Sequence, residues 1–210
     1  TRRENMSSPS FSESMKRVSK RNDSNIVLAL DITGPRTELQ ARSLEILDKT
    51  APYVCGVKIN HHLVLPLGLS NGVEKVVARA HDLGLPTIMD CKINDIGHTN
   101  AVIAEQYFNA GFDAVIANPF VGWAEGLQPV FELGRKLGRG ILVLVYMSHK
   151  AADEGYGQWV LLNGRTRRPQ YMVFARKSLE WGADGAIVGA TYPEKIEEIS
   201  GVLRDKVPIY

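Results

Sequence analysis

Short apolar runs alternate with amphipathic helical patterns through most of this chain, and this alternation restricts the fold more than any other feature of the sequence. The runs with the length and composition of strands are 26–30, 53–59, 86–89, 114–117, 141–146, 186–188 and 207–210. Between them, apolar residues recur three and four positions apart, as at Val73, Val76 and Ala80, which places them on one helical face. Because strands that are apolar on both faces are typical of parallel sheets covered by helices, the sequence predicts an α/β fold.

Glycines mark the expected ends of several helices. Gly84, Gly111 and Gly182 each follow a helical pattern and precede a strand-like run, as expected of a residue that ends a helix in the left-handed conformation. The segments 110–113 and 181–184 resemble one helix-to-strand joint used twice. No linker or shift of composition follows, so we expect a single domain over residues 25–210.

The residues before that domain have a different character. Residues 1 to about 12 are polar and rich in serine, which is typical of a disordered or artificial leader. Residues 12–21 are compatible with a short basic helix. We therefore expect residues 1–24 to form a leader and a short helix.

A parallel α/β sheet of this length can close in two ways, as a doubly wound sheet or as a (β/α)8 TIM barrel. The first strand is not followed by a G-x-G-x-x-G turn, which argues against a dinucleotide-binding doubly wound sheet. Polar residues also recur at the ends of different strands, where a barrel would gather them at one mouth. These residues are Asp31, Lys58, Asp90, Lys92, Asn118 and Ser148. The sequence therefore favours the barrel.

Composition and charge exclude several functional classes. Hydrophobic residues make up 44% of the chain, charged residues 23%, and the formal net charge is +2, so neither nucleic acid nor a membrane is an expected partner. No apolar run approaches the roughly 18 residues of a membrane span, and a cytoplasmic location is the default. Cys55 and Cys91 lack the clustered spacing of a metal or redox site and are interpreted as reduced core thiols. The adjacent His61 and His62 point different ways, so we expect no metal ligands there.

Charges gather around one stretch, Asp90 to Asp95. On a strand, Asp90 and Lys92 project from the same face, so an acid and a base should lie side by side. Taken alone, this pair fits an ion pair that caps a strand as well as it fits a catalytic site. With Asp31 and Lys58, however, four charges on successive strand ends could alternate in sign, which favours a site.

These motifs together resemble a known family. Asp31 in LALD, Lys58 in VKIN, D-x-K-x-x-D at 90–95, Thr99, and Met-Ser-His at 147–149 are similar to the orotidine 5'-monophosphate decarboxylases of the archaeal-like type. The resemblance runs from about residue 25 onward. It implies a homodimeric TIM barrel that converts orotidine monophosphate to UMP and CO2 in pyrimidine biosynthesis, with no metal or organic cofactor.

The resemblance also implies a role for each catalytic residue. Asp90 would face the substrate carboxylate, and Lys92 would deliver a proton to C6 after loss of CO2. Lys58 would order the charge network and bind the ribose, while Asp95 would reach into the site of the partner subunit.

Four further residues would bind the substrate. The resemblance implies that Asp31 binds ribose hydroxyls and that Ser148 contacts the pyrimidine. Ile96 and Thr99 would be contributed across the dimer interface, with Ile96 lining the base pocket of the partner.

Two other functions remain open at this point. Magnesium-dependent keto-gulonate-phosphate decarboxylases and hexulose-phosphate synthases share D-x-K-x-x-D, but they carry an acidic metal ligand where this chain has Lys58, and a lysine is a poor neighbour for a metal ion. A non-catalytic nucleotide-binding barrel is the second alternative. It is disfavoured because binding alone does not require a proton donor beside a carboxylate.

One segment departs from the family pattern, and another has no clear period. The family holds phosphate with loops after strands seven and eight, whereas residues 207–210 are expected to lie within strand seven, so we expect the C-terminal part of the barrel to be missing from this sequence. Residues 150–168 lack a clear period and could form a mobile lid over the base or a solvated surface loop.

Overall fold

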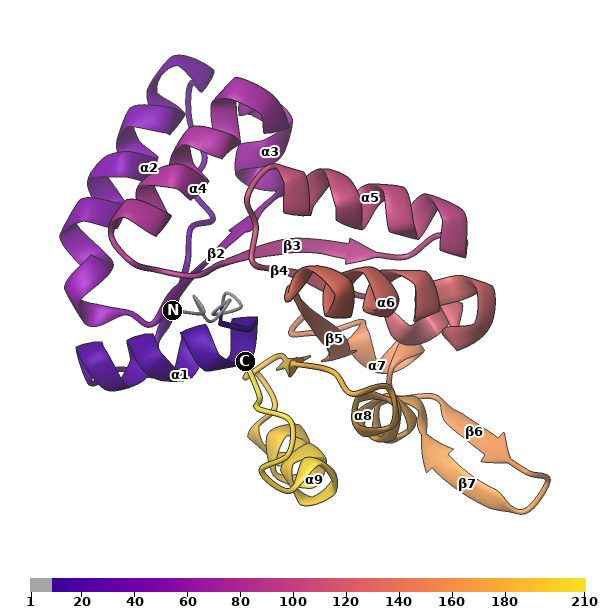
Figure 1. The fold of residues 1–210 in the computed structure, drawn as a ribbon. Coiled ribbons are helices and arrows are strands. Elements are labelled where there is room, and N and C mark those ends of the chain that lie inside the picture. The colour runs from indigo at the N-terminus through magenta and orange to yellow at the C-terminus, as the bar shows by residue number, and fades with distance from the viewer. Residues whose placement is uncertain (1–8) are drawn as a thin grey trace, which may run out of the picture. The chain divides into compact units, whose positions relative to one another are not determined.

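The computed structural model describes residues 9–210, which form two compact units (Figure 1). The N-terminal unit takes the chain up to Met89, together with Tyr107–Ala114 and Leu133–Gly140. The C-terminal unit consists of Asp90–Gln106, Val115–Glu132 and Ile141–Tyr210. Most of the expected leader lies outside the described residues.

Helices and strands alternate as the sequence predicts. The strands are β1 (Val27–Ala29), β2 (Gly56–Asn60), β3 (Thr87–Ile93), β4 (Ala114–Ala117), β5 (Gly140–Tyr146), β6 (Trp159–Leu162), β7 (Thr166–Pro169) and β8 (Gly185–Val188). The α-helices are α1 (Phe11–Asn22), α2 (Arg36–Thr50), α3 (His61–Leu67), α4 (Glu74–Asp82), α5 (Gly97–Asn109), α6 (Gln128–Leu137), α7 (Ala152–Gly155), α8 (Gln170–Trp181) and α9 (Pro193–Leu203). No described helix is long and apolar enough to cross a membrane.

The strand order decides between the two closures. The main sheet has the order β1-β2-β3-β4-β5-β8, so each strand lies beside the next parallel strand of the chain. β1 pairs with β2 in parallel, with Ala29 opposite Lys58, and β5 pairs with β8 in the same direction. A doubly wound sheet would reverse its order at a switch point, whereas a barrel follows the chain. The expected barrel class is therefore confirmed.

The chain returns to the sheet at its C-terminal end. Ile209 forms a parallel bridge with Ala186, and the amide of Tyr210 donates to the Ala186 carbonyl over 2.8 Å. Residues 208–210 thus lie beside β8, where the seventh barrel strand is expected.

Helix α1 packs against the starts of two strands in the N-terminal unit. Ser10 and Glu13 form a capping box at its first turn, and its buried residues are Phe11, Met15 and Val18. A Cβ on Gly56 would come within 3.1 Å of the Met15 sulfur, and one on Gly140 would overlap the Phe11 ring. Because these glycines begin β2 and β5, their missing side chains let the helix approach the sheet.

The predicted repeated joint is present in both units. In the N-terminal unit, the Asp113 amide donates to the Thr87 carbonyl (3.0 Å) while its carboxylate accepts from the Thr87 amide (2.8 Å). In the C-terminal unit, Asp184 makes the same reciprocal pair with Ile141, at 2.9 Å in each direction. Each aspartate therefore links the start of its own strand to the start of a neighbouring strand.

Asp113 carries further bonds. Its carboxylate also accepts from the Thr87 hydroxyl (3.1 Å), His81 Nε2 (2.8 Å) and Arg139 Nη1 (2.6 Å). Burial alone would raise the pKa of Asp113, but the hydrogen bonds from His81 and Thr87 and the charges of His81 and Arg139 outweigh it and lower the pKa.

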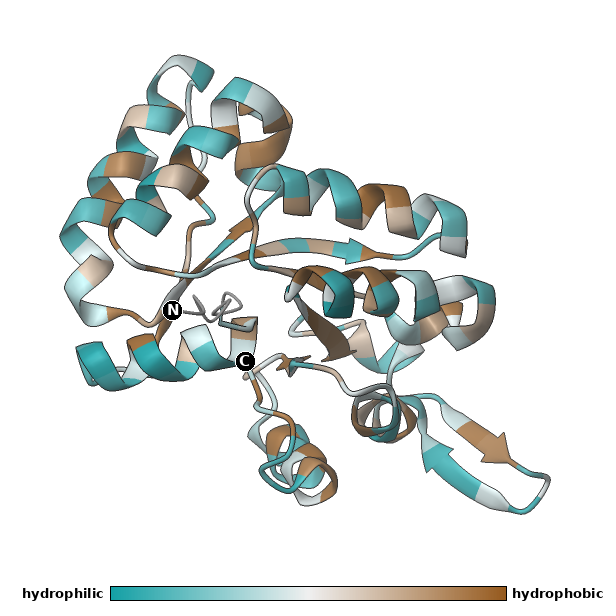
Figure 2. Cartoon of the chain, viewed as in Figure 1, coloured by the Kyte–Doolittle hydropathy of each residue, from teal (hydrophilic) through white to brown (hydrophobic). Residues whose placement is uncertain are grey.

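The segment after β5 differs from the sequence prediction. Within 150–168, β6 and β7 form an antiparallel hairpin that extends from α7 and α8 of the same unit (Figure 1). Residues 163–165 connect the two strands, with Asn163 and Gly164 at φ of 50° and 68°, and a bond from the Arg165 amide to the Leu162 carbonyl (3.1 Å) closes the turn. The segment therefore contains two strands that the sequence analysis did not predict. Trp159, at the start of β6, is 70% exposed, and β6 is mostly hydrophobic where β7 is mostly polar (Figure 2).

Candidate active site

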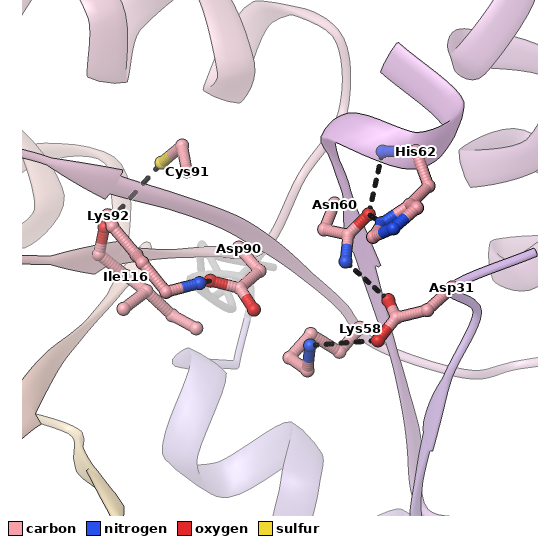
Figure 3. A network of polar contacts seen from close by, with 8 residues as sticks. All are labelled: Asp31, Lys58, Asn60, His62, Asp90, Cys91, Lys92 and Ile116. Atoms are coloured by element: carbon pink, nitrogen blue, oxygen red, sulfur yellow. Dashed lines mark hydrogen bonds and ion pairs between the residues drawn. The ribbon is translucent and has the colours of Figure 1, made fainter. Parts of the chain in front are cut away.

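The first expected pair lies in the N-terminal unit. Asp31 follows β1 by two residues, Lys58 lies in β2, and Lys58 Nζ is 3.9 Å from Asp31 Oδ2 (Figure 3). The parallel register brings these ends together, because the Leu30 amide donates to the Lys58 carbonyl. The structure thus confirms that these two charges meet, although Lys58 lies in the middle of β2 (Gly56–Asn60) and not at its expected end.

An amide side chain that the sequence analysis missed completes this pair. Asn60 Nδ2 donates to Asp31 Oδ1 over 2.6 Å, and Asn60 Oδ1 accepts from the His62 amide over 2.8 Å (Figure 3). The Asp31 carboxylate is therefore held from two sides, by Lys58 and by Asn60. The available signal was spacing, since Asn60 follows Lys58 by two residues and shares its strand face.

The second pair lies in the C-terminal unit. Lys92 Nζ is 2.6 Å from Asp90 Oδ1, and Asp90 is only 8% exposed (Figure 3). The prediction that these side chains lie side by side is confirmed. Both residues lie inside β3, which continues to Ile93 beyond its expected end at residue 89.

The backbone at Lys92 is not regular strand. Its φ is 48°, in the left-handed region that residues other than glycine rarely occupy. A residue held in this region costs about 1–3 kcal/mol, and such residues cluster at active sites as well as occurring in turns. Because Lys92 lies in a strand and not in a turn, its backbone strain supports its candidacy as a functional residue.

The cysteine between this acid and base is a different kind of group. Cys91 Sγ lies 3.6 Å from the Ile116 carbonyl, and burial raises the pKa of the thiol to about 12 (Figure 3). Cys55 is a buried residue, and burial raises its pKa. Neither cysteine forms a disulfide, and neither has the lowered pKa of a nucleophile.

Three expected site residues lie close together in the chain, in the turn after β3 and in the first turn of α5. The Asp95 carboxylate accepts from the Ile96 amide over 2.7 Å, Ile96 is 69% exposed, and Thr99 lies in the first turn of α5. The buried Asn100, a second residue that the sequence analysis missed, accepts from the Asp95 amide over 2.9 Å. Only its place directly after Thr99 could have drawn attention to it.

Ser148 follows β5 by two residues and is exposed. Gly189, the residue after β8, lies against it: a Cβ on Gly189 would come within 2.6 Å of the Ser148 Cα. The Gly189 amide also donates to the Tyr146 carbonyl over 2.9 Å. The ends of β5 and β8 therefore set the path of the backbone at Ser148.

The structure thus describes two acid–lysine pairs, Asp31 with Lys58 and Asp90 with Lys92, each within one unit. The turn that contains Asp95, called the Asp95 turn, and the segment at Ser148 both lie in the C-terminal unit. The alternation of all four charges in a single network stays a prediction. Across residues 9–210, no group of three or more histidine, cysteine, aspartate or glutamate side chains is placed to hold a metal ion.

The fold and these pairs define a (β/α)-barrel protein with paired acidic and basic groups on or directly after its strands. The chain belongs to the orotidine 5'-phosphate decarboxylase / HUMPS family, whose model matches residues 24–208. The resemblance inferred from the motifs is confirmed.

Known relatives agree with this assignment. Orotidine 5'-phosphate decarboxylase of Thermococcus kodakarensis is 37% identical over 187 residues, which cover 89% of this chain and 76% of the relative. The enzyme of the same name from Methanosarcina mazei is 32% identical over 184 residues, covering 88% and 73%. The crystal structure of orotidine 5'-phosphate decarboxylase from Pyrococcus horikoshii matches with a TM-score of 0.70 at 30% identity, covering 87% of this chain and 76% of that one.

Proposed function

We propose that this chain decarboxylates orotidine 5'-monophosphate to UMP and CO2 in pyrimidine biosynthesis, without a metal or organic cofactor, through a carbanion at C6 that Lys92 protonates. Family membership and the names of the relatives support this reaction. The observation that carries it is the contact between the Lys92 ammonium and the buried Asp90 carboxylate in the C-terminal half of the barrel strand β3.

The chemistry explains why this pair is needed. Loss of CO2 leaves a carbanion with no adjacent electron sink, so the site must supply positive charge where negative charge develops, and Lys92 supplies it. A substrate carboxylate facing Asp90 at about 4 Å would be repelled by roughly 4 kcal/mol at an effective dielectric near 20. Large enzymatic accelerations require about 8–23 kcal/mol, so binding of the phosphate and ribose must provide much of the remainder.

The pair in the N-terminal unit suits the ribose. Asp31 is an acceptor for sugar hydroxyls, and Lys58 and Asn60 hold its carboxylate in place. Ser148 is assigned to the pyrimidine. The hairpin of β6 and β7 occupies the segment predicted as a lid over the base, and its closure stays a prediction.

We further propose a homodimer in which Asp95, Ile96 and Thr99 enter the site of the partner subunit. The exposure of Ile96 supports this arrangement, because a large apolar side chain left in water is typical of an interface. A cytoplasmic location fits the reaction and also stays a prediction.

The family name covers the magnesium-dependent relatives as well, so the second candidate needs a test. Lys58 favours the nucleotide enzyme, because it places a cation beside Asp31 where those relatives need a metal ligand. Consumption of orotidine monophosphate, followed by its absorbance, should be unaffected by EDTA. Loss of turnover on chelation would contradict the proposal, and UMP binding without turnover would instead favour a non-catalytic barrel.

A variant pair tests the role of Lys92. Lys92→Ala should abolish decarboxylation and leave UMP binding largely intact, measured by calorimetric titration. Lys49→Ala is the control, since Lys49 forms an exposed ion pair with Glu45 within α2 and should not affect turnover. Retained turnover in Lys92→Ala would remove its assigned role.

A further inference from the structure

Asn100 is a fully buried polar residue near the start of α5, with 0% of its surface exposed. Its Oδ1 accepts from the Asp95 amide over 2.9 Å, and its Nδ2 donates both to the Asp95 carbonyl and to the Gly126 carbonyl, the latter over 3.0 Å. One side chain therefore binds both backbone polar groups of Asp95. It also joins Asp95 to the turn that follows β4.

That turn has an unusual and well-defined backbone. Trp123–Leu127 contains Glu125 at φ 55°, and it is closed by a bond from the Leu127 amide to the Gly122 carbonyl (3.1 Å). Gly97, two residues after Asp95, lies directly on it, since a Cβ on Gly97 would come within 2.8 Å of the Glu125 carbonyl oxygen. The Asp95 turn thus rests on a second turn, and Asn100 connects the two.

The N-terminal unit contains the same turn without the link to a site residue. In Leu69–Val73, Asn71 has φ 63° and the Val73 amide donates to the Gly68 carbonyl over 3.0 Å. Here Gln40 of α2 donates through Nε2 to the Gly72 carbonyl over 3.1 Å, as Asn100 does to Gly126. Gln40 and Asn100 therefore share one task, which is to hold the turn through a hydrogen bond to its glycine carbonyl. Asn100 has a second task, because it also binds the backbone of Asp95.

We infer that Asn100 is a positioning residue for the reaction, which fixes the backbone of Asp95 so that the Asp95 carboxylate and the Ile96 side chain are presented to the partner subunit. This inference rests on the proposed dimeric site. Without Asn100, the Asp95 amide and carbonyl lose their buried partner, and the turn gains freedom where the partner site needs a fixed group. Because small displacements of a reacting group are costly, kcat should fall about 10- to 100-fold, with a smaller change in KM.

The first experiment compares variants of the intact dimer. Asn100→Ala and the milder Asn100→Ser are assayed for kcat and KM with orotidine monophosphate, and their thermal unfolding is recorded. Gln40→Ala is the matched control, because it removes the corresponding bond at the corresponding turn and should lower stability without lowering kcat. A loss of kcat in Gln40→Ala equal to that in Asn100→Ser would overturn the inference.

The second experiment uses mixed dimers, because in the proposed dimer each active site takes Lys92 from one subunit and Asp95 from the other. Asn100→Ala and Lys92→Ala chains, each inactive or nearly so, are co-expressed with different tags, and only mixed dimers are purified. One site then combines an intact Lys92 with a correctly held Asp95 from the other chain, so about half of the wild-type activity per dimer is expected. A residue that merely stabilises its own subunit would not be rescued in this way.

A mixed dimer of Asp95→Ala and Lys92→Ala is the reference. Activity in both mixtures supports the inference, and activity in the reference alone overturns it. Absence of activity in both would overturn the shared-site proposal and this inference with it. Wild-type protein without any turnover would instead overturn the decarboxylase function itself.

Discussion

Replacing Asp113 with alanine should destabilise the protein measurably, although this residue lies outside the candidate site. The carboxylate takes two bonds from Thr87 and is paired with His81 and Arg139. The two Thr87 bonds, to a mostly buried anion, are worth about 1.5 kcal/mol each, whereas the more exposed charge pairs add little. The expected loss is about 3 kcal/mol, which corresponds to a fall in Tm of about 6–12 °C for a chain of this length.

Urea unfolding at pH 7 and at fixed protein concentration measures this loss, since assembly would otherwise shift the midpoint. Asp82→Ala, at an exposed position of α4, is the control and should change stability by less than about 0.5 kcal/mol. Asp113→Asn should fall between the two, because its oxygen can still accept from Thr87 while the charge is lost.

The pH dependence follows from the lowered pKa of Asp113. A carboxyl with a pKa below its unfolded value of about 3.9 contributes fully above that pH and loses its contribution as the pH falls through the folded pKa. The difference in stability between wild type and Asp113→Ala should therefore be largest at neutral pH and shrink in acid. A difference that stays constant down to pH 3, or equal effects of Asp113→Ala and Asp82→Ala, would refute the reasoning.

Two further predictions concern the site and the thiols. Gly189→Ala should raise KM for orotidine monophosphate several-fold, because the added Cβ would displace the Ser148 backbone. Gly201→Ala on α9 is the control and should leave KM unchanged, since an added Cβ there meets no atom within 4 Å. Equal KM values for the two variants in steady-state assays would contradict this prediction. Cys55 and Cys91 should both resist a thiol-specific disulfide reagent at pH 8 in the folded protein, because burial raises the pKa of both thiols, and both should react after unfolding. Rapid reaction of either thiol in the native state would be the contrary result.

Structure is predicted best from the sequence where packing against a sheet or helix imposes a regular spacing of apolar residues. Strands buried on both faces, such as β5, and the joints at Asp113 and Asp184 are visible because sheet and helix geometry dictate which residue types can stand there. The pairing of Asp90 with Lys92 follows from the same spacing argument.

Prediction fails where a local feature has no period or depends on distant residues. The hairpin of β6 and β7 lies at the surface and its strands lack a buried face, although Asn163-Gly164 beside an apolar run was a usable turn signal. The left-handed backbone of Lys92 has no signature in its residue type. The tasks of Asn60 and Asn100 depend on which backbone groups tertiary structure brings near their amides.

The packing of α1 has a consequence for how the protein is made. This helix precedes every strand of residues 9–210, yet the atoms that cover its buried face include Gly56 and Gly140, at the starts of β2 and β5. Met15 can therefore meet Gly56 once β2 has been synthesised, whereas Phe11 lacks its contact with Gly140 until translation has passed β4. Contacts between positions so far apart require closure of a long loop before they give any stability. Docking of α1 is thus expected to be complete only after β5 has been synthesised.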